Sequence, residues 1–413
     1  MNRTQPDPAE HQIVQVARDL QPLIAECADE TEANGRPPDH LIETFTDAGL
    51  FRLFIPEAAG GLEVPPLVTF HTVEALSEAD PSSGWVVMLA AELSLVTGFL
   101  ETEHLREMIG SDQPGGPRCR IAGSARPTNW GKRAEGGWII NGIATYASGI
   151  DHATQVVAAF RDEDQPADSY MSFLDPDQGT ILQTWDTMGL RGTGSHDYES
   201  ANVFAPDQRT MKIGSRPVAR GPNWRIPDGG IASWLQNGGQ ALGAAQGAIN
   251  EVVGQAKYVA SKSDSRSLAE REHFRVALGR AQARVGSARS YVREMGSIAW
   301  QSVLDGTPNL DAVAQWRLAN VNAVHAATEA VEMLFPAAGT NAIHRRWTLE
   351  RRFRDLQVAR RHNAGLDFNW DAGTRHMLGM PALTRGSAIP NRDRYRSEHE
   401  VGEAGAAGGS RRD

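Results

Sequence analysis

Cysteine is scarce in this sequence: among its 413 residues only Cys27 and Cys119 are cysteines. Two thiols cannot build a disulfide framework or a multi-thiolate metal site, and they suit a reducing cytosol. The 12 histidines show no HExxH or comparable metal-ligand spacing. We therefore expect no metal site.

Basic charge and long apolar segments are also in short supply. A net charge of -10 argues against wrapping nucleic acid or binding an anionic membrane. The N-terminus, MNRTQPDPAEHQ, is polar and lacks the apolar core of a signal peptide. The most apolar stretch, from Trp85 to Leu100, contains Glu92 and is short for a bilayer, so it predicts a buried helix. The expected location is the cytoplasm.

Three common catalytic motifs are missing as well. The sequence contains no GxxxxGK[ST] phosphate loop and no GxSxG nucleophile elbow. Its nearest glycine cluster, RGTGS at 191–195, lies between predicted strands, whereas a dinucleotide fingerprint needs a strand, a glycine turn and a helix in succession.

Periodicity and turn residues divide the chain into three parts. Residues from about 10 to 110 read as helices, including one from Leu67 to Ala79 that Asp80-Pro81 ends, after which Ser82 or Ser83 is the expected N-cap. Short β-forming runs follow, and then long helices. The predicted boundaries are 1–118 for an N-terminal helical domain, 119–215 for a central β domain, 225–390 for a helical bundle and 391–413 for a disordered tail.

One of the later helices carries a heptad pattern. Apolar residues recur there at alternating four- and three-residue steps, namely Phe274, Leu278, Ala281, Val285, Ala288, Val292, Met295 and Ala299. This spacing predicts a helix packed along one seam of a bundle.

Four segments in this order carry a family resemblance: DPSSGW at 80–85, ASGIDHA at 147–153, WDTMGLRGTGSHDYESANVFAPDQR at 185–209, and the stretch from LFPAAGT to RHMLG at 334–379. Together they resemble the oxygenase components of two-component flavin monooxygenases, which share the acyl-CoA dehydrogenase fold. The resemblance covers about residues 10 to 385.

The resemblance implies a mainly α fold with a central β domain: an N-terminal helical domain, a middle β-barrel and a C-terminal four-helix bundle, usually in a homotetramer. It further implies that a separate NAD(P)H-dependent reductase supplies reduced FMN or FAD. Dioxygen then forms a flavin C4a-hydroperoxide that hydroxylates a small aromatic or polycyclic substrate. Oxygenation at nitrogen or sulfur uses the same chemistry and stays open.

An acyl-CoA dehydrogenase is the main alternative, and it needs a carboxylate base. By resemblance, that base stands eight residues after Asp355, where this chain has Asn363, or on the helix that begins near Ile231, which has no carboxylate before Glu251. Neither position carries a carboxylate, so a dehydrogenase would need its base at a different place in the chain. A non-catalytic scaffold that has kept the fold is the third hypothesis.

The resemblance assigns the site residues. His362 and Ser148 are the predicted catalytic residues, with His362 taking a proton from the substrate or hydrogen-bonding the peroxide. Trp85, Leu93 and His362 are expected to line the substrate site. In phenol-hydroxylating relatives a histidine often stands where this chain has Leu93, so a simple phenol is not a secure substrate. The expected flavin contacts are Ser124, Tyr146, Ser148, Gly149, Thr193, Ser195, Gly339 and Thr340.

Overall fold

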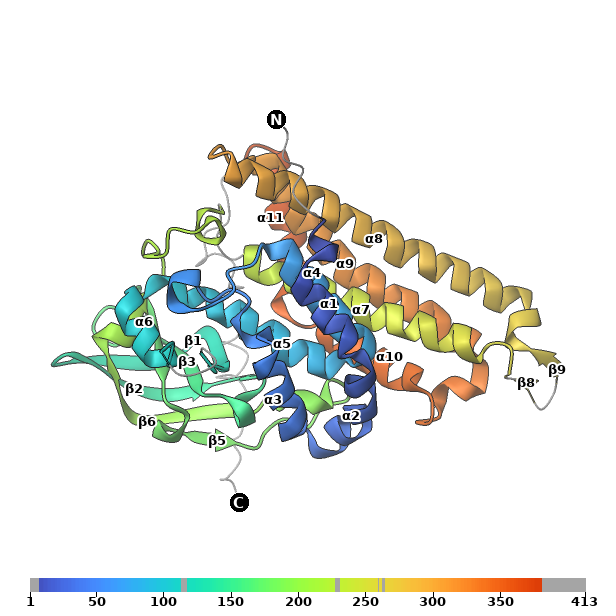
Figure 1. Cartoon of the computed structure of the whole chain (residues 1–413), viewed down its shortest axis with the longest axis horizontal. Coiled ribbons are helices and arrows are strands. Elements are labelled where there is room, and N and C mark those ends of the chain that lie inside the picture. Colours follow the sequence, from blue (N-terminus) through green and yellow to red (C-terminus); the bar gives the residue numbers. More distant parts are fainter. Residues whose placement is uncertain (1–6, 113–116, 227–230, 259, 262–263, 381–413) are drawn as a thin grey trace, which may run out of the picture.

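The computed structural model of the chain describes residues 7–112, 117–226, 231–258, 260–261 and 264–380. Helices come first, a β-sheet follows, and long helices complete the chain (Figure 1). This order confirms the predicted fold class. The tail expected after residue 390 lies outside the described residues.

The N-terminal part, within residues 7–112, is helical. Its α-helices are α1 (Gln12–Asp19), α2 (Gln21–Asn34), α3 (Asp39–Asp47), α4 (Pro66–Ala79), α5 (Pro81–Ser94) and α6 (Thr102–Ile109). The segment Pro81–Phe99 is long and apolar enough to cross a membrane, but 83% of its most apolar window is buried inside the protein. The predicted buried helix is therefore confirmed.

The N-cap of α5 differs from the expectation. Asp80 caps the helix, because its Oδ2 accepts a hydrogen bond from the backbone N–H of Ser83 at 2.8 Å. A carboxylate placed before a proline at the first helical position satisfies the free N–H groups of the first turn. Ser82 and Ser83 are instead buried within that turn.

The central part is one mixed sheet. Its strands are β1 (Ile121–Ala134), β2 (Gly137–Ala144), β3 (Gln155–Asp162), β4 (Ser169–Leu174), β5 (Thr180–Leu182), β6 (Asp197–Pro206) and β7 (Thr210–Lys212). The order is β5-β6-β2-β1-β3-β4-β7, with β1 and β3 parallel and the other pairs antiparallel. In the described strands β5 and β7 are open edges, so this is an open sheet where a barrel was expected.

Strand β1 is irregular in its middle. It pairs with β3 up to Ser124 and again from Asn129, and it pairs with β2 only from Trp130 onward. Residues 125–128 therefore belong to neither ladder, and Arg126 and Thr128 are exposed there. Such a break frees backbone groups for other partners.

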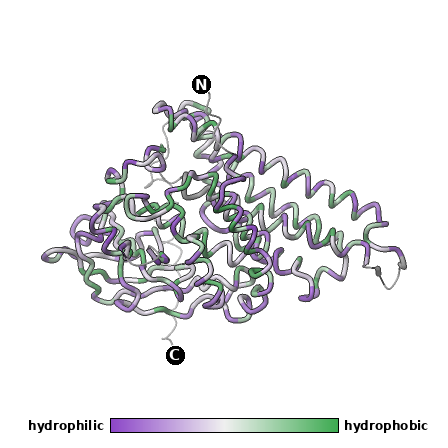
Figure 2. The backbone as a smooth tube through the Cα atoms, viewed as in Figure 1, coloured by the Kyte–Doolittle hydropathy of each residue, from purple (hydrophilic) through white to green (hydrophobic). Residues whose placement is uncertain are grey.

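The C-terminal part is a helical bundle. It contains α7 (Ile231–Gln255), α8 (Glu272–Leu304), α9 (Leu310–Ala337), α10 (Thr348–Ala359) and α11 (Phe368–Met377), with the hairpin β8 (Ala260–Ser261) and β9 (Asp264–Ser267) between α7 and α8. The heptad residues of α8 are buried or partly buried in the bundle core, which confirms that seam. In Figure 2 the colour changes repeatedly between hydrophilic and hydrophobic along α8, as expected for a helix that packs along one side.

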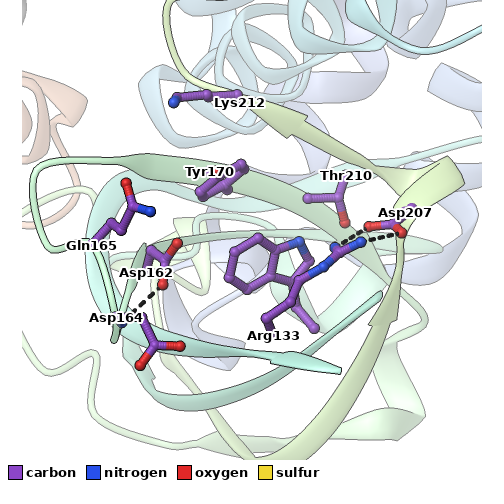
Figure 3. A pocket seen from close by; sticks show the side chains of 9 residues that line it. Arg133, Asp162, Asp164, Gln165, Tyr170, Asp207, Thr210 and Lys212 are labelled. Carbon is purple, nitrogen blue, oxygen red and sulfur yellow. Dashed lines mark hydrogen bonds and ion pairs between the residues drawn. The ribbon is translucent and has the colours of Figure 1, made fainter. Parts of the chain in front are cut away.

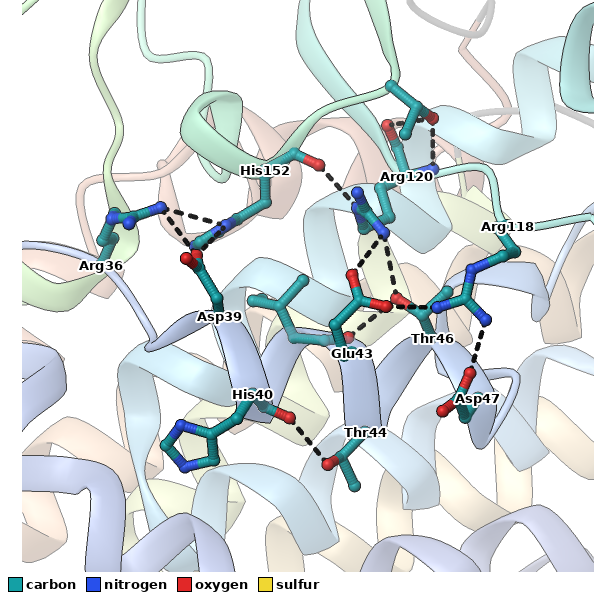
Figure 4. A network of polar contacts seen from close by, with 12 residues as sticks. Arg36, Asp39, His40, Glu43, Thr44, Thr46, Asp47, Arg118, Arg120 and His152 are labelled. Carbon is teal, nitrogen blue, oxygen red and sulfur yellow. Dashed lines mark hydrogen bonds and ion pairs between the residues drawn. The ribbon is translucent and has the colours of Figure 1, made fainter.

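Ion pairs fasten the N-terminal helices to the sheet (Figure 4). Arg118 pairs with Glu43 and Asp47 of α3, and Arg120 pairs with Glu43. Arg120 Nε also donates to the carbonyl oxygen of His152 at 2.6 Å. Because His152 ends the turn that follows Ser148, this network fixes α3, the start of β1 and that turn relative to one another.

The packing of α8 gives a first prediction. Phe274 is 1% exposed in the bundle core. Phe274→Ala should lower the free energy of unfolding by about 3–5 kcal/mol, because it removes apolar contacts and leaves a cavity. Chemical denaturation measures this loss. Val276→Ala, at a 45% exposed position on the same helix, is the control and should change stability by about 0.5 kcal/mol or less. Equal losses in the two variants would contradict the predicted seam.

Candidate active site

Four separate segments meet at one point in the structure. Trp85 comes from α5, Ser148 from the turn after β2, Ser195 from the loop before β6, and His362 from the turn after α10. The Trp85 and His362 rings meet edge to face, with centroids 5.4 Å apart. The fold thus brings together four residues that the sequence had singled out.

A chain of hydrogen bonds links three hydroxyl groups. Trp85 Nε1 donates to Ser148 Oγ at 3.1 Å. Ser148 Oγ lies 2.6 Å from Ser195 Oγ, which lies 2.6 Å from Thr193 Oγ1. Thr193 donates its proton to the carbonyl oxygen of Leu190 at 2.8 Å.

That last bond fixes the direction of the whole chain. A carbonyl oxygen only accepts, so the proton of Thr193 is committed to Leu190 and Ser195 must donate to Thr193. Ser148 must then donate to Ser195. The Ser148 hydroxyl keeps one lone pair, so toward any further partner it acts as an acceptor.

The backbone holds Ser148 in place. Gly149 has a φ of +76°, a conformation that glycine adopts without strain, and its N–H donates to the carbonyl oxygen of Thr193 at 2.8 Å. The N–H of Ala147 donates to the carbonyl oxygen of His196 at 2.9 Å. Two backbone bonds therefore tie this turn to the loop that carries Thr193 and Ser195.

His362 is an uncharged base in this environment. Burial lowers its pKa to about 4, and the Arg126 guanidinium acts in the same direction. Its Nδ1 accepts a long hydrogen bond, 3.5 Å, from the N–H of Ala364. This contact assigns the proton of the neutral ring to Nε2. The sequence suggested titration near neutrality, and the structure shifts His362 toward donating a hydrogen bond.

Two contacts that sequence reasoning missed hold this region. Asp355 Oδ1 accepts a hydrogen bond from the N–H of Leu190 at 2.6 Å, which joins α10 to the loop carrying Thr193. His325 Nε2 lies 2.9 Å from the carbonyl oxygen of Gly365, beside His362. Neither contact had a sequence signal, because each joins residues at least 40 positions apart.

The surroundings of Ser148 suit a flavin. Residues 125–128 of β1 offer backbone groups outside both strand ladders, and Ser124 borders them with its Oγ accepting from the N–H of Arg126 at 3.3 Å. Tyr146 is 59% exposed at a φ of +61° and lies edge to face with Trp185. The exposed Tyr146 ring, backbone groups outside the two strand ladders and the Arg126 guanidinium match a flavin ring with its phosphate.

Three predicted site residues lie elsewhere. Leu93 is buried with Ile55 and Phe173 in a separate apolar cluster, away from the one that contains Trp85. Gly339 and Thr340 are exposed on the turn Gly339–Ile343, which packs against α9 and α10. These three are therefore not brought to Ser148 within the chain.

An open groove of about 480 Å³ lies on another part of the sheet (Figure 3). Its lining includes Trp138 at the start of β2, whereas Ser148 lies beyond the other end of that strand, whose six steps from Trp138 to Ala144 span about 20 Å at 3.3 Å per residue. Arg133 pairs with Asp207 and Lys212 pairs with Asp168 there. The groove is therefore distinct from the site around Ser148.

Comparison with known families agrees with this architecture. The sequence-family model of the acyl-CoA dehydrogenase N-terminal domain matches residues 7–102 of this chain. The family model of the acyl-CoA dehydrogenase C-terminal domain matches residues 235–365. The 3-HSA hydroxylase from Rhodococcus sp. RHA1 has the same fold, with a TM-score of 0.83 at 23% identity over 92% of this chain and all of that one. Fold and site together define an acyl-CoA dehydrogenase-like protein.

Relatives with assigned functions identify a narrower class of protein within this fold. The indole-3-acetate monooxygenase of Pseudomonas putida is 31% identical over 325 residues, which cover 78% of this chain and 82% of that protein. The oxygenase subunit HsaA of a flavin-dependent monooxygenase from Rhodococcus jostii (strain RHA1) is 27% identical, covering 84% of this chain and 92% of that subunit. The chain belongs to the oxygenase components of flavin-dependent monooxygenases. It is thus an oxidoreductase that uses reduced flavin and dioxygen with a separate flavin reductase, as predicted, and the dehydrogenase alternative is not supported.

The low pKa of His362 predicts a pH-dependent stability. The pKa of His362 is about 4 in the folded state and about 6.5 in the unfolded state. Between these two pH values the unfolded chain therefore binds one more proton than the folded protein. The free energy of unfolding should fall as the pH drops from about 7 to about 4, by up to about 3 kcal/mol. His362→Gln should remove this part of the decline. Denaturant unfolding across the window measures it, with His273→Gln at an exposed position as control. A variant that declines in parallel with the wild type would contradict the assignment.

Proposed function

We propose that this oxygenase component hydroxylates a small aromatic or polycyclic substrate at a site between Trp85, Ser148 and His362. The observation that carries the proposal is the directed hydrogen-bond chain that ends at Ser148 beside the uncharged His362. The names of the relatives support an aromatic substrate, since indole-3-acetate is a bicyclic arene. We further propose a homotetramer located in the cytoplasm.

Ser148 is suited to the reduced form of the cofactor. A bound reduced flavin supplies the electrons that activate dioxygen, so that one oxygen atom reaches the substrate. The N–H at position N5 exists in the reduced ring and is absent from the oxidised one. The Ser148 hydroxyl is left as an acceptor, so it would bind that N–H and hold the reduced form. Tyr146, Gly149 and Ser124 would complete the contacts, with FMN and FAD both compatible.

His362 would act at the oxygen that is transferred. Its uncharged ring carries a proton on Nε2, and this N–H would donate a hydrogen bond to that oxygen or to a substrate hydroxyl. A fixed donor stabilises the negative charge that develops as an O–O bond breaks. The Trp85 ring packs against His362 and restricts both its orientation and the access of water.

Gly339 and Thr340 would serve a neighbouring subunit. They stand exposed on their turn, where Ile343 is 65% exposed as well. In a homotetramer this turn would reach the flavin of an adjacent chain, which accounts for its distance from Ser148 in the single chain.

The proposal predicts how His362 variants behave. The wild type with reduced flavin, an aromatic substrate and labelled dioxygen should place one labelled oxygen atom on a ring carbon. His362→Ala should slow product formation by about 100-fold, because a donor to developing charge is lost. His362→Gln, which retains an N–H donor, should keep more activity than His362→Ala.

Mass spectrometry of the product and flavin-binding titrations separate the outcomes. Full turnover in His362→Ala with unchanged flavin affinity would refute the role of His362. Labelled oxygen on nitrogen or sulfur would replace ring hydroxylation by the other oxygenation chemistries.

Ser148 gives a separate prediction. Ser148→Ala removes the acceptor and leaves Trp85 Nε1 without its partner. We expect weaker binding of reduced flavin by about tenfold, and more hydrogen peroxide released per flavin oxidised. The matched control is Ser200→Ala, since Ser200 is a buried serine of strand β6 whose hydroxyl makes no hydrogen bond to the described residues. Identical peroxide yields in wild type and Ser148→Ala would argue against this role.

A further inference from the structure

One face of α5 differs from the rest of that helix. Of its residues, only Leu89 and Glu92 are partly exposed, while the others are buried. They follow Trp85 at steps of four and three residues, so all three share one face. Burial nevertheless dominates the surroundings of Glu92. Glu92 is thus largely enclosed and still partly exposed, on the face of α5 that also carries Leu89 and Trp85. Leu89 packs against the apolar cluster that contains Trp85, so this face extends from the Trp85 end of the site.

Glu92 is oriented by a contact from α7. Asn237, which is 2% exposed, donates from Nδ2 to Glu92 Oε1 at 2.7 Å. Among the described residues this is the one hydrogen bond to the carboxyl, and Oε2 is left for another partner. Asn237 therefore holds Glu92 in a fixed direction without neutralising a charge.

The protonation state follows from these surroundings. Burial raises the pKa of Glu92 well above its usual range, and the Asn237 amide opposes this only in part. No charged group of the described residues contributes, on α5 itself or on the packed helix α7. Burial therefore favours the uncharged acid form of Glu92. Because Oε1 accepts from Asn237, the acid proton lies on Oε2, as in other buried acids that donate hydrogen bonds.

The distance between Trp85 and Glu92 along α5 indicates the length of a ligand that contacts both residues. Seven residues separate Trp85 from Glu92, which is about 10 Å along a helix. A molecule of two or more fused rings spans this length, with its reacting ring beside Trp85 and His362 and its far end at Glu92. Leu89 lies between them and offers an apolar surface to the rings.

We propose that Glu92 selects the substrate by donating a hydrogen bond from Oε2 to a carbonyl-type acceptor oxygen at the end of the arene remote from His362. This inference rests on the proposed aromatic hydroxylation and adds the substrate class, a fused-ring arene with a ketone or similar oxygen. Glu92 is a specificity residue here, because the oxygen transfer itself takes place at the other end.

Equilibrium binding of a matched pair of probes tests the proposal. Hydroxytetralone and hydroxytetralin share their rings and phenol and differ in a ketone oxygen. Calorimetry on the full chain, without flavin and with reduced flavin under anaerobic conditions, should show the ketone binding about tenfold tighter. Glu92→Leu should bring the ratio of the two dissociation constants close to one. Glu92→Gln should keep the preference, because its amide donates where the acid did.

A matched control comes from a similar pair on the outside of the bundle. Glu78 of α4 accepts a hydrogen bond from Asn250 of α7 at 2.7 Å, and this contact is exposed. Glu78→Gln should leave the probe ratio as in the wild type. A second measurement needs no variant: the wild-type preference for the ketone should decline as rising pH ionises Glu92, and Glu92→Gln should show no such decline.

The outcomes separate this inference from the proposed function. No preference for the ketone in the wild type, or an unchanged preference in Glu92→Leu, would overturn the role of Glu92. Selective binding that Glu92→Leu abolishes supports it, even where neither probe is oxygenated. Failure of the wild type to oxygenate any arene would count against the proposed function alone.

Discussion

The directed chain of hydroxyl groups from Trp85 through Ser148 and Ser195 to Thr193 is the interaction on which the site depends. It joins the N-terminal helices, the turn after β2 and the loop before β6, and it ends on a backbone carbonyl that can only accept. Because each hydroxyl has one proton, a single fixed bond at one end decides what the other end offers. The polarity of the site is therefore a property of the assembled fold.

Burial then decides the charges around this chain. Burial lowers the pKa of His362 to about 4 and raises that of Glu92. Desolvation penalises whichever form is charged, so it favours the uncharged form of a base and of an acid alike. Two uncharged hydrogen-bonding groups beside the Trp85 face of α5 suit a neutral aromatic ligand. Asp355, whose pKa burial raises to about 7, shows the same effect where α10 meets the sheet.

Long-range contacts hold the N-terminal helices, the sheet and the C-terminal bundle in fixed positions relative to one another. Arg118 and Arg120 bind the start of β1 to α3, and Asp355 binds α10 to the loop that carries Thr193. Each contact connects two of the three parts of the chain, so the site cannot form from any one part by itself. This accounts for a candidate active site assembled from residues as far apart in the chain as Trp85 and His362.

The sequence by itself determined the order of helices, sheet and bundle and the seam of α8, and the family resemblance of its motifs singled out Trp85, Ser148, Ser195 and His362. Local periodicity and motif order carry this information, because helix faces and turns depend on neighbouring residues. Tertiary structure decided the rest: Asp80 as the cap, the open sheet, the place of Leu93 in another cluster, and the roles of Asp355 and Glu92. Burial and hydrogen-bond direction arise from residues distant in the chain, so no local pattern contains them.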